Sequence, residues 1–161
     1  MTHTASLDKF VKVTTVAINI LFAVSIISFF TVMKEVGLEF KLITGIFLLL
    51  VFGLAYAYRP MSYTINDSSL IIHRPIKDLA IERYKIVSVE VLNPENLAYS
   101  LRTFGVGGYY GYFGKFANTK MGSMTWYATR KDNTVLVRTT EDEKIILTPD
   151  DPLAFVADYY G

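Results

Sequence analysis

The chain of 161 residues contains no cysteine and has few charged residues for its length. The lack of cysteine excludes disulfide bonds, thiolate nucleophiles and cysteine-ligated metal sites. Charged residues make up only 19% of the chain and the formal net charge is +1, so no global attraction to nucleic acid is expected. An apolar content of 52% is high for a soluble domain and directs attention to membrane segments.

Two long stretches lack any charged residue: residues 13–32, which are twenty residues, and residues 42–58, which are seventeen. A helix needs about 20 apolar residues to cross the hydrocarbon core, so both stretches predict transmembrane helices. The alternative, two buried core helices, is disfavoured by the length of both runs. No small-residue cleavage site follows the first run, which indicates a retained anchor rather than a signal peptide.

The distribution of Lys and Arg predicts the orientation of this hairpin. The linker of residues 33–41 is short and carries two cations, Lys34 and Lys41, balanced by two acidic residues. More cations flank the other ends of the spans: Lys9, Lys12, Arg59, Arg74, Lys77 and Arg83. Because Lys and Arg near span ends favour the cytoplasmic side, residues 1–12 and a domain of residues 59–161 are both predicted in the cytoplasm.

The two predicted spans contain no ionisable side chain, and Asn19 is their most polar residue. Proton relays and ion pathways require ionisable groups inside the membrane. The pair therefore indicates an anchor rather than a pore.

In residues 60–161, apolar and polar residues alternate over short runs that are separated by turn residues, which predicts short β-strands. Residues 66–69 and 131–133 each predict a hairpin turn. A helix over residues 150–160 is predicted to close the chain, with Thr148 as its cap and Pro149 at its first position. Asp150 and Asp151 are interpreted as helix-start residues rather than a catalytic carboxylate pair. The predicted fold is mostly β (α+β), a small antiparallel sandwich or barrel of about seven strands with one C-terminal helix.

Several segments of this half resemble a bacterial pleckstrin-homology-like family that often follows membrane helices. They are RTFGVGGYYGYFGKF (residues 102–116), WYATR (126–130), NTVLVRT (133–139) and KIILTPDDPLAFV (144–156). The resemblance covers residues 60–160 and implies that fold, a binding role, the bacterial inner membrane as location, and no catalytic residues. Phosphoinositide-binding relatives carry cations in the first hairpin, whereas residues 65–70 here carry none.

The stretch FGVGGYYGYFGKF, residues 104–116, holds five glycines and six aromatic residues. A phosphate-binding loop of the Walker type requires Ser or Thr after Gly-Lys, but Phe116 follows Lys115. A dinucleotide-binding loop requires a third glycine where Tyr110 stands. Two interpretations remain: a bulged strand whose aromatics fill the core, or exposed aromatics that contact the bilayer interface or a partner. The second defines a candidate interaction surface of Arg102, Phe104, Tyr109, Tyr110, Tyr112, Phe113 and Lys115.

Nothing in the sequence indicates an enzyme, a metal site or a cofactor. His3 is expected in a flexible N-terminal segment and His73 on a strand, too far apart in sequence for a metal motif. The predicted function is a membrane-anchored, non-enzymatic module that binds a protein or peptide, a second copy of itself included. Two alternatives stay open, a lipid-sensing domain at the membrane surface and an accessory subunit of a membrane enzyme or transporter.

Overall fold

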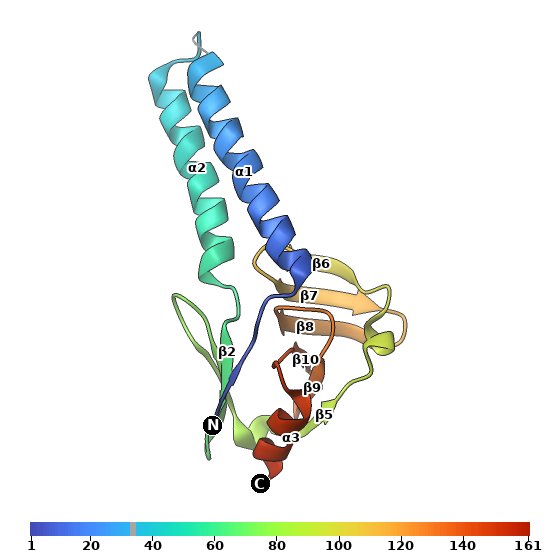
Figure 1. Cartoon of the computed structure of the whole chain (residues 1–161). Coiled ribbons are helices and arrows are strands. Elements are labelled where there is room, and N and C mark those ends of the chain that lie inside the picture. Colours follow the sequence, from blue (N-terminus) through green and yellow to red (C-terminus); the bar gives the residue numbers. More distant parts are fainter. Residues whose placement is uncertain (33–34) are drawn as a thin grey trace.

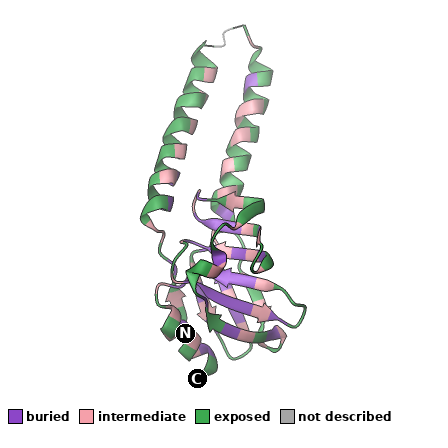
Figure 2. Cartoon of the chain, turned by 90° about the vertical axis from the view of Figure 1, so that its right-hand side faces the viewer, coloured by how far each residue is buried: buried purple, intermediate pink, exposed green. Residues whose placement is uncertain are grey.

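The computed structural model describes residues 1–32 and 35–161, and it consists of a helical hairpin that projects from a mostly β domain (Figure 1). The hairpin is formed by α1 (Lys9–Val32) and α2 (Leu38–Ala57). Both helices are long and apolar enough to cross a membrane, and their side chains are mostly exposed (Figure 2). Lys34 of the predicted linker lies outside the described residues.

A four-stranded antiparallel sheet takes one strand from before the hairpin and three from after it. Its strands, neighbours in chain order, are β1 (Thr2–Thr4), β2 (Ser62–Ile65), β3 (Ser69–His73) and β4 (Leu79–Glu82). The turn of residues 66–69 is confirmed, since the Asn66 amide donates to the Ser69 carbonyl at 2.9 Å. The sheet places the residues before α1 and after α2 in one unit.

A six-stranded sheet forms the rest of the domain, in the order β5-β9-β10-β8-β7-β6. Two short 3-10 helices, η1 (Arg83–Lys85) and η2 (Pro94–Leu97), flank its first strand. The strands are β5 (Ile86–Val91), β6 (Leu101–Gly107), β7 (Tyr112–Asn118), β8 (Gly122–Ala128), β9 (Val135–Thr139) and β10 (Lys144–Leu147). Among the described residues, nine strands follow the hairpin instead of about seven, because β4 was not expected and the glycine-rich stretch forms two strands.

The predicted hairpin between β8 and β9 is wrong. β10 lies between these strands, parallel to β8 with Ile145 opposite Thr125 and antiparallel to β9. The turn composition of residues 131–133 permits a reversal of the chain but does not decide which strands pair across it. Residues 135–137 and 145–147 are all buried, because both faces of the sheet are covered. Continuous apolar runs of this kind are typical of strands that are covered on both faces, and β9 and β10 lie inside the sheet.

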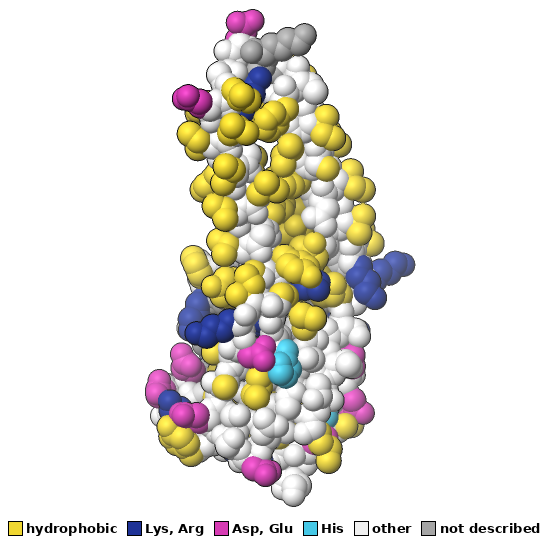
Figure 3. All heavy atoms as spheres, turned by 90° about the vertical axis from the view of Figure 1, so that its left-hand side faces the viewer, with side chains coloured by type: hydrophobic (Ala, Val, Ile, Leu, Met, Phe, Trp, Pro, Cys, Tyr) yellow, Lys and Arg dark blue, Asp and Glu magenta, His cyan; other side chains and the backbone are white. Residues whose placement is uncertain are grey.

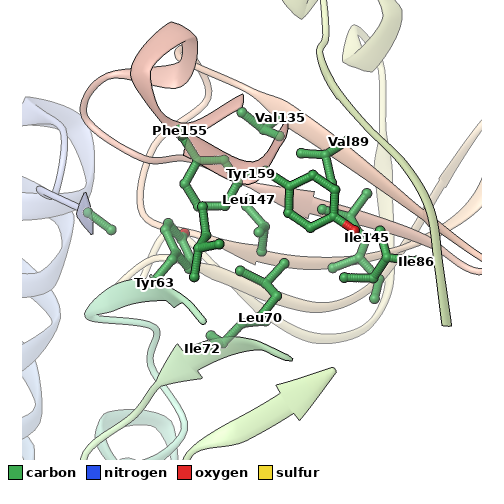
Figure 4. Packing of buried hydrophobic residues seen from close by; sticks show 13 residues of the cluster. Tyr63, Leu70, Ile72, Ile86, Val89, Val135, Ile145, Leu147, Phe155 and Tyr159 are labelled. Carbon is green, nitrogen blue, oxygen red and sulfur yellow. The ribbon is translucent and has the colours of Figure 1, made fainter. Parts of the chain in front are cut away.

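The six-stranded sheet packs an apolar cluster on each face. Successive residues of β9 point to opposite faces, with Val135 and Val137 in one cluster and Leu136 in the other. Figure 4 shows the first cluster, in which Tyr63 and Leu70 of the small sheet meet side chains of the large sheet and the C-terminal helix. Burial raises the pKa of the Tyr63 hydroxyl to about 12, and that hydroxyl donates to the Tyr127 carbonyl at 2.6 Å.

The C-terminal helix α3 (Pro152–Tyr160) begins later than predicted. Asp151 is its N-cap, with the Asp151 side chain accepting a hydrogen bond from the Ala154 amide at 3.0 Å, and Pro152 occupies the first turn. Thr148 is therefore not the cap. Its hydroxyl is buried and accepts a bond from the Thr129 amide at 2.9 Å.

The N-terminal segment is ordered, which corrects the expectation for His3. β1 pairs with β2 in the register His3 opposite Tyr63. The His3 Nε2 atom lies 3.1 Å from Asp158 Oδ2, and its ring lies edge-on to Phe155 with centroids 5.0 Å apart. A strand of three polar residues gives no strong sequence signal, so only the tertiary contacts order it.

Asp150 ties the segment between β1 and α1 to the domain. Its carboxylate accepts bonds from the Thr4 hydroxyl at 2.7 Å and the Ser6 amide at 2.9 Å, and Arg130 Nη1 lies 3.1 Å away. Partial burial by itself would raise the pKa of Asp150, but these hydrogen bonds and the Arg130 charge outweigh it and hold the pKa below its ordinary value.

We expect Asp150→Asn to lower the free energy of unfolding at pH 6 by about 1–2 kcal/mol, because bonds to a charged acceptor are lost. The folded-state pKa is depressed, so the carboxylate stabilises the fold above its unfolded pKa of about 4, and this contribution is lost as the pH falls through the folded value. Melting curves at pH 6 and pH 3 test this, with the exposed Asp142→Asn as control. A gap between wild type and variant that does not shrink at pH 3 contradicts the assignment.

Candidate functional site

The glycine-rich stretch of residues 104–116 forms an antiparallel hairpin of β6 and β7, so it contains no loop that leads from a strand into a helix. Gly105 faces Gly114 across this pair, and both have positive φ, 105° and 119°. A Cβ added to Gly114 would overlap the Phe104 carbonyl oxygen and lie 2.8 Å from the Gly105 Cα. These glycines permit a close approach of two backbones, and they do not form a phosphate cradle.

The tip of the β6–β7 hairpin, residues 108–111, docks on the lower ends of α1 and α2 (Figure 1). The Tyr109 hydroxyl donates to Asn19 Oδ1 at 2.7 Å, and the Tyr110 amide donates to Thr15 Oγ1 at 2.9 Å. The Tyr109 ring meets Phe52 of α2 edge-on, with centroids 5.5 Å apart. The most polar residue of the first predicted span thus has a partner on the β domain.

Arg59, just after α2, lies between an aromatic ring of α2 and one of the hairpin tip. Its guanidinium carbon lies 4.5 Å from the centroid of the Tyr56 ring and 5.1 Å from that of the Tyr110 ring. A cation held between two aromatic faces is attracted by both rings. Figure 3 shows further Lys and Arg side chains at the level where the helices meet the domain.

The structure separates the seven residues of the candidate interaction surface into three groups. Arg102, Phe104 and Lys115 are exposed, Tyr109 and Tyr110 lie against the helices, and Tyr112 and Phe113 are buried. Phe104 is 77% exposed although it is a large apolar residue. The interpretation as core aromatics therefore applies to Tyr112 and Phe113, and the interpretation as exposed aromatics applies to Phe104.

A groove of about 680 Å³ opens between α2 and the β6–β7 hairpin. Apolar and aromatic side chains form most of its wall, including Val51, Leu54, Phe104, Val106, Tyr109 and Phe113. Two lining residues with polar groups come from outside these elements, Arg74 of the β3–β4 loop and Tyr127 of β8, and Tyr58 and Tyr109 carry further hydroxyls. We call this feature the junction groove. Its wall combines five separate segments of the chain, which is why no sequence motif indicated it.

Arg74 reaches the junction groove because the β3–β4 loop is attached to the end of α2. The Ile76 amide donates to the Ala57 carbonyl at 3.4 Å, and the Arg74 guanidinium lies 5.4 Å from the Tyr58 ring centroid. Arg74 Nε donates to the Lys77 carbonyl at 2.7 Å. Within the described residues, no carboxylate forms an ion pair with the Arg74 guanidinium.

A second cleft, also of about 680 Å³, opens on the other side of β6 beneath η2. Arg102 and Lys131 lie at this cleft together with the buried rings of Tyr112 and Trp126. Lys131 Nζ is 5.2 Å from the centroid of the Tyr112 ring. Two cations beside aromatic walls favour an acidic partner, and both side chains are exposed to solvent.

His73 lies between a hydroxyl and a carboxylate. The same hydroxyl–histidine–carboxylate arrangement occurs in enzymes that use nucleophilic catalysis. His73 Nε2 lies 2.9 Å from Thr64 Oγ1, and Nδ1 lies 2.8 Å from Asp78 Oδ2. The Thr64 hydroxyl is also bonded to Thr2, and neither Thr64 nor His73 lines either groove described above. Asp78 Oδ1 also accepts a bond from the Arg74 amide at 3.2 Å, so the group ties together residues of the β3–β4 loop, and this bond and the one from His73 lower the pKa of Asp78.

The arrangement offers binding surfaces and no metal centre: in residues 1–32 and 35–161, no group of three metal-ligating side chains occurs. A family model described as Bacterial PH domain matches residues 61–161. No curated protein and no solved structure matches the chain.

Proposed function

Because the chain belongs to the bacterial PH domain family, we propose that it is a membrane-anchored, non-enzymatic binding module that presents this domain at the cytoplasmic face of the membrane. In this proposal α1 and α2 cross the membrane, and their side chains are suitably apolar and exposed. The domain recognises a protein or peptide partner beside the bilayer.

The docking of the hairpin tip on both helices is the observation that carries the proposal. Asn19 lies six residues inside the uncharged stretch that starts at Val13, or about 9 Å along a helix. A tip bonded to Asn19 would therefore pass through the interfacial layer and reach the outer part of the hydrocarbon core. Tyrosine suits that layer because one end of the ring is apolar and the other polar. The domain would be held against the membrane rather than suspended below it.

The positions of the termini and cations support the orientation. β1 and β2 are neighbours in one sheet, so the segments before α1 and after α2 lie on the same side of the hairpin. Lys9, Lys12 and Arg59 lie at this end, and cations near span ends favour the cytoplasm.

The exposed part of the candidate interaction surface supports partner binding. β6 is the edge strand of the large sheet, and it exposes Leu101 and Phe104 on either side of Arg102. Exposed aromatic and arginine side chains are enriched among the residues that dominate the energy of protein interfaces. Arg102 and Lys131 in the second cleft favour acidic residues on the partner.

A photoreactive amino acid at Phe104 tests the proposal in native membranes. We expect a discrete protein adduct, because Phe104 is exposed and lies on the edge strand. The same label at Tyr84 is the control, since Tyr84 is 75% exposed but follows β4 on the opposite part of the domain. Labelling of lipid alone at Phe104, or the same protein adducts at both positions, contradicts the assignment of β6 as a protein-binding surface.

A further inference from the structure

We propose that the junction groove binds an anionic phospholipid of the surrounding bilayer, with its phosphate at Arg74 and one acyl chain along α2. This inference rests on the proposed membrane anchoring, because the lipid would enter sideways from the bilayer. It shares one residue with the protein-binding surface, because Phe104 also lines the groove; the variants below therefore change groove residues that are not part of that surface.

The groove has the composition that an amphiphile requires. Its wall is mostly apolar along α2 and β6, while the Arg74 guanidinium and the phenol side chains of three tyrosines lie among its lining residues. Its volume of about 680 Å³ falls in the range of small-molecule sites, about 300–1,000 Å³. Asp78 lies on the same loop and accepts a bond from the Arg74 amide, but it forms no ion pair with the guanidinium. A wholly apolar ligand would leave the guanidinium without a direct partner, and a small inorganic anion would leave the apolar wall without one.

The depth of each part along α2 matches the two ends of a phospholipid. Arg74 lies beside Tyr58, the residue that caps the C-terminus of α2, at the level expected for headgroups. Val51 and Leu54 lie up to seven residues earlier in the same helix, or about 10 Å deeper in the bilayer. Both are about half exposed and would face acyl chains outside the groove as well, so the groove is continuous with the lipid-facing side of α2.

The charge of the groove favours an anionic lipid. Arg74 has no acidic ion-pair partner within the described part of the chain. Two further cations lie in segments that adjoin Arg74 and Tyr58: the exposed Lys77 in the β3–β4 loop and Arg59 just after α2. Planar guanidinium groups bind phosphate oxygens through two parallel hydrogen bonds, and nearby cations add attraction for a net negative headgroup.

The experiment uses the full chain in nanodiscs of phosphatidylcholine that contain a minority of phosphatidylglycerol. After gentle extraction, native mass spectrometry counts the phospholipids that stay bound to the protein. We expect one retained phosphatidylglycerol per chain in the wild type. Arg74→Gln should reduce its preference over phosphatidylcholine about tenfold, the effect of one lost charge-assisted contact. Arg138→Gln, a change of an exposed cation on β9 that pairs with Glu90, should leave the preference unchanged.

A second pair of variants tests the acyl-chain part without changing charge. Ala55 lines the groove, so Ala55→Trp should fill it and abolish retention of either lipid. Leu50→Trp places the same ring on an exposed position of α2 outside the groove and should have no effect. Melting temperatures of all variants show whether a loss of binding reflects unfolding.

The outcomes separate the two proposals. Equal lipid retention in wild type, Arg74→Gln and Ala55→Trp overturns the lipid site, as does retention of a free fatty acid or of phosphatidylcholine without selectivity. A protein adduct at Phe104 is expected whether or not lipid is retained. Failure of that crosslink with selective retention of phosphatidylglycerol overturns only the protein-binding surface.

Discussion

Gly114→Ala is expected to destabilise the domain by about 3 kcal/mol or more. An alanine at φ 119° is strained, which costs of order 1–3 kcal/mol by itself. The new Cβ would also overlap the Phe104 carbonyl oxygen of the paired strand, and a backbone atom cannot move aside as a flexible side chain does. The melting temperature should fall by about 10 °C or more in a domain of this size.

Gly107→Ala is the matched control for this prediction. Gly107 lies on β6 without a positive φ, and its nearest neighbour is the flexible Arg102 side chain, 3.6 Å from the added Cβ. Its melting temperature should stay within a few degrees of the wild type, because an alanine in a strand costs little. If Gly114→Ala and Gly107→Ala had the same melting temperature, the two strands would not approach each other as described.

The double change Tyr109→Ala and Tyr110→Ala should release the hairpin tip from the helices. It removes two rings that pack on Phe52 and Tyr56 and the hydrogen bond to Asn19. Partial burial of two rings and one bond in an apolar environment correspond to about 2–4 kcal/mol of docking free energy. The undocked population should therefore rise by roughly thirtyfold or more.

Spin labels on the two units measure this docking. Because the chain has no cysteine, single cysteines at Leu38 and Tyr84 can be labelled without side reactions. Both positions are exposed, one at the start of α2 and one on the domain. The wild type should give one narrow distance distribution and the double variant a broad one. Tyr99→Ala, at a residue that is 96% exposed, should keep the narrow distribution. A narrow distribution in all three proteins would contradict the docking.

Local features of the fold could be predicted from the sequence, whereas contacts between distant segments could not. The uncharged stretches predicted both helices, because their length and composition are local properties. The turn of residues 66–69 and the short helix at the C-terminus were also predicted from local residue types. The family resemblance of the second half was confirmed by the match over residues 61–161.

Pairing between distant segments was beyond the reach of these patterns. Residues 131–133 have turn composition, yet β10 lies between β8 and β9, and a local turn signal does not say which strands pair. The strand at Thr2–Thr4 is too short to signal itself and forms only because β2 offers an edge. Nothing local distinguishes Arg74 from other exposed cations until the β3–β4 loop attaches to α2.

Residues 104–116 show where this limit falls. Their sequence by itself argued against a phosphate loop, because the Ser or Thr of a Walker loop and the third glycine of a dinucleotide loop are both absent. It left two interpretations open, a bulged strand with core aromatics or exposed aromatics that contact the bilayer or a partner. Only the tertiary structure decided that Tyr112 and Phe113 are buried, that Tyr109 and Tyr110 hold the helices, and that Phe104 stays exposed. The physical reason is that a side chain's burial depends on what the rest of the chain places beside it, and that information is not in its neighbours.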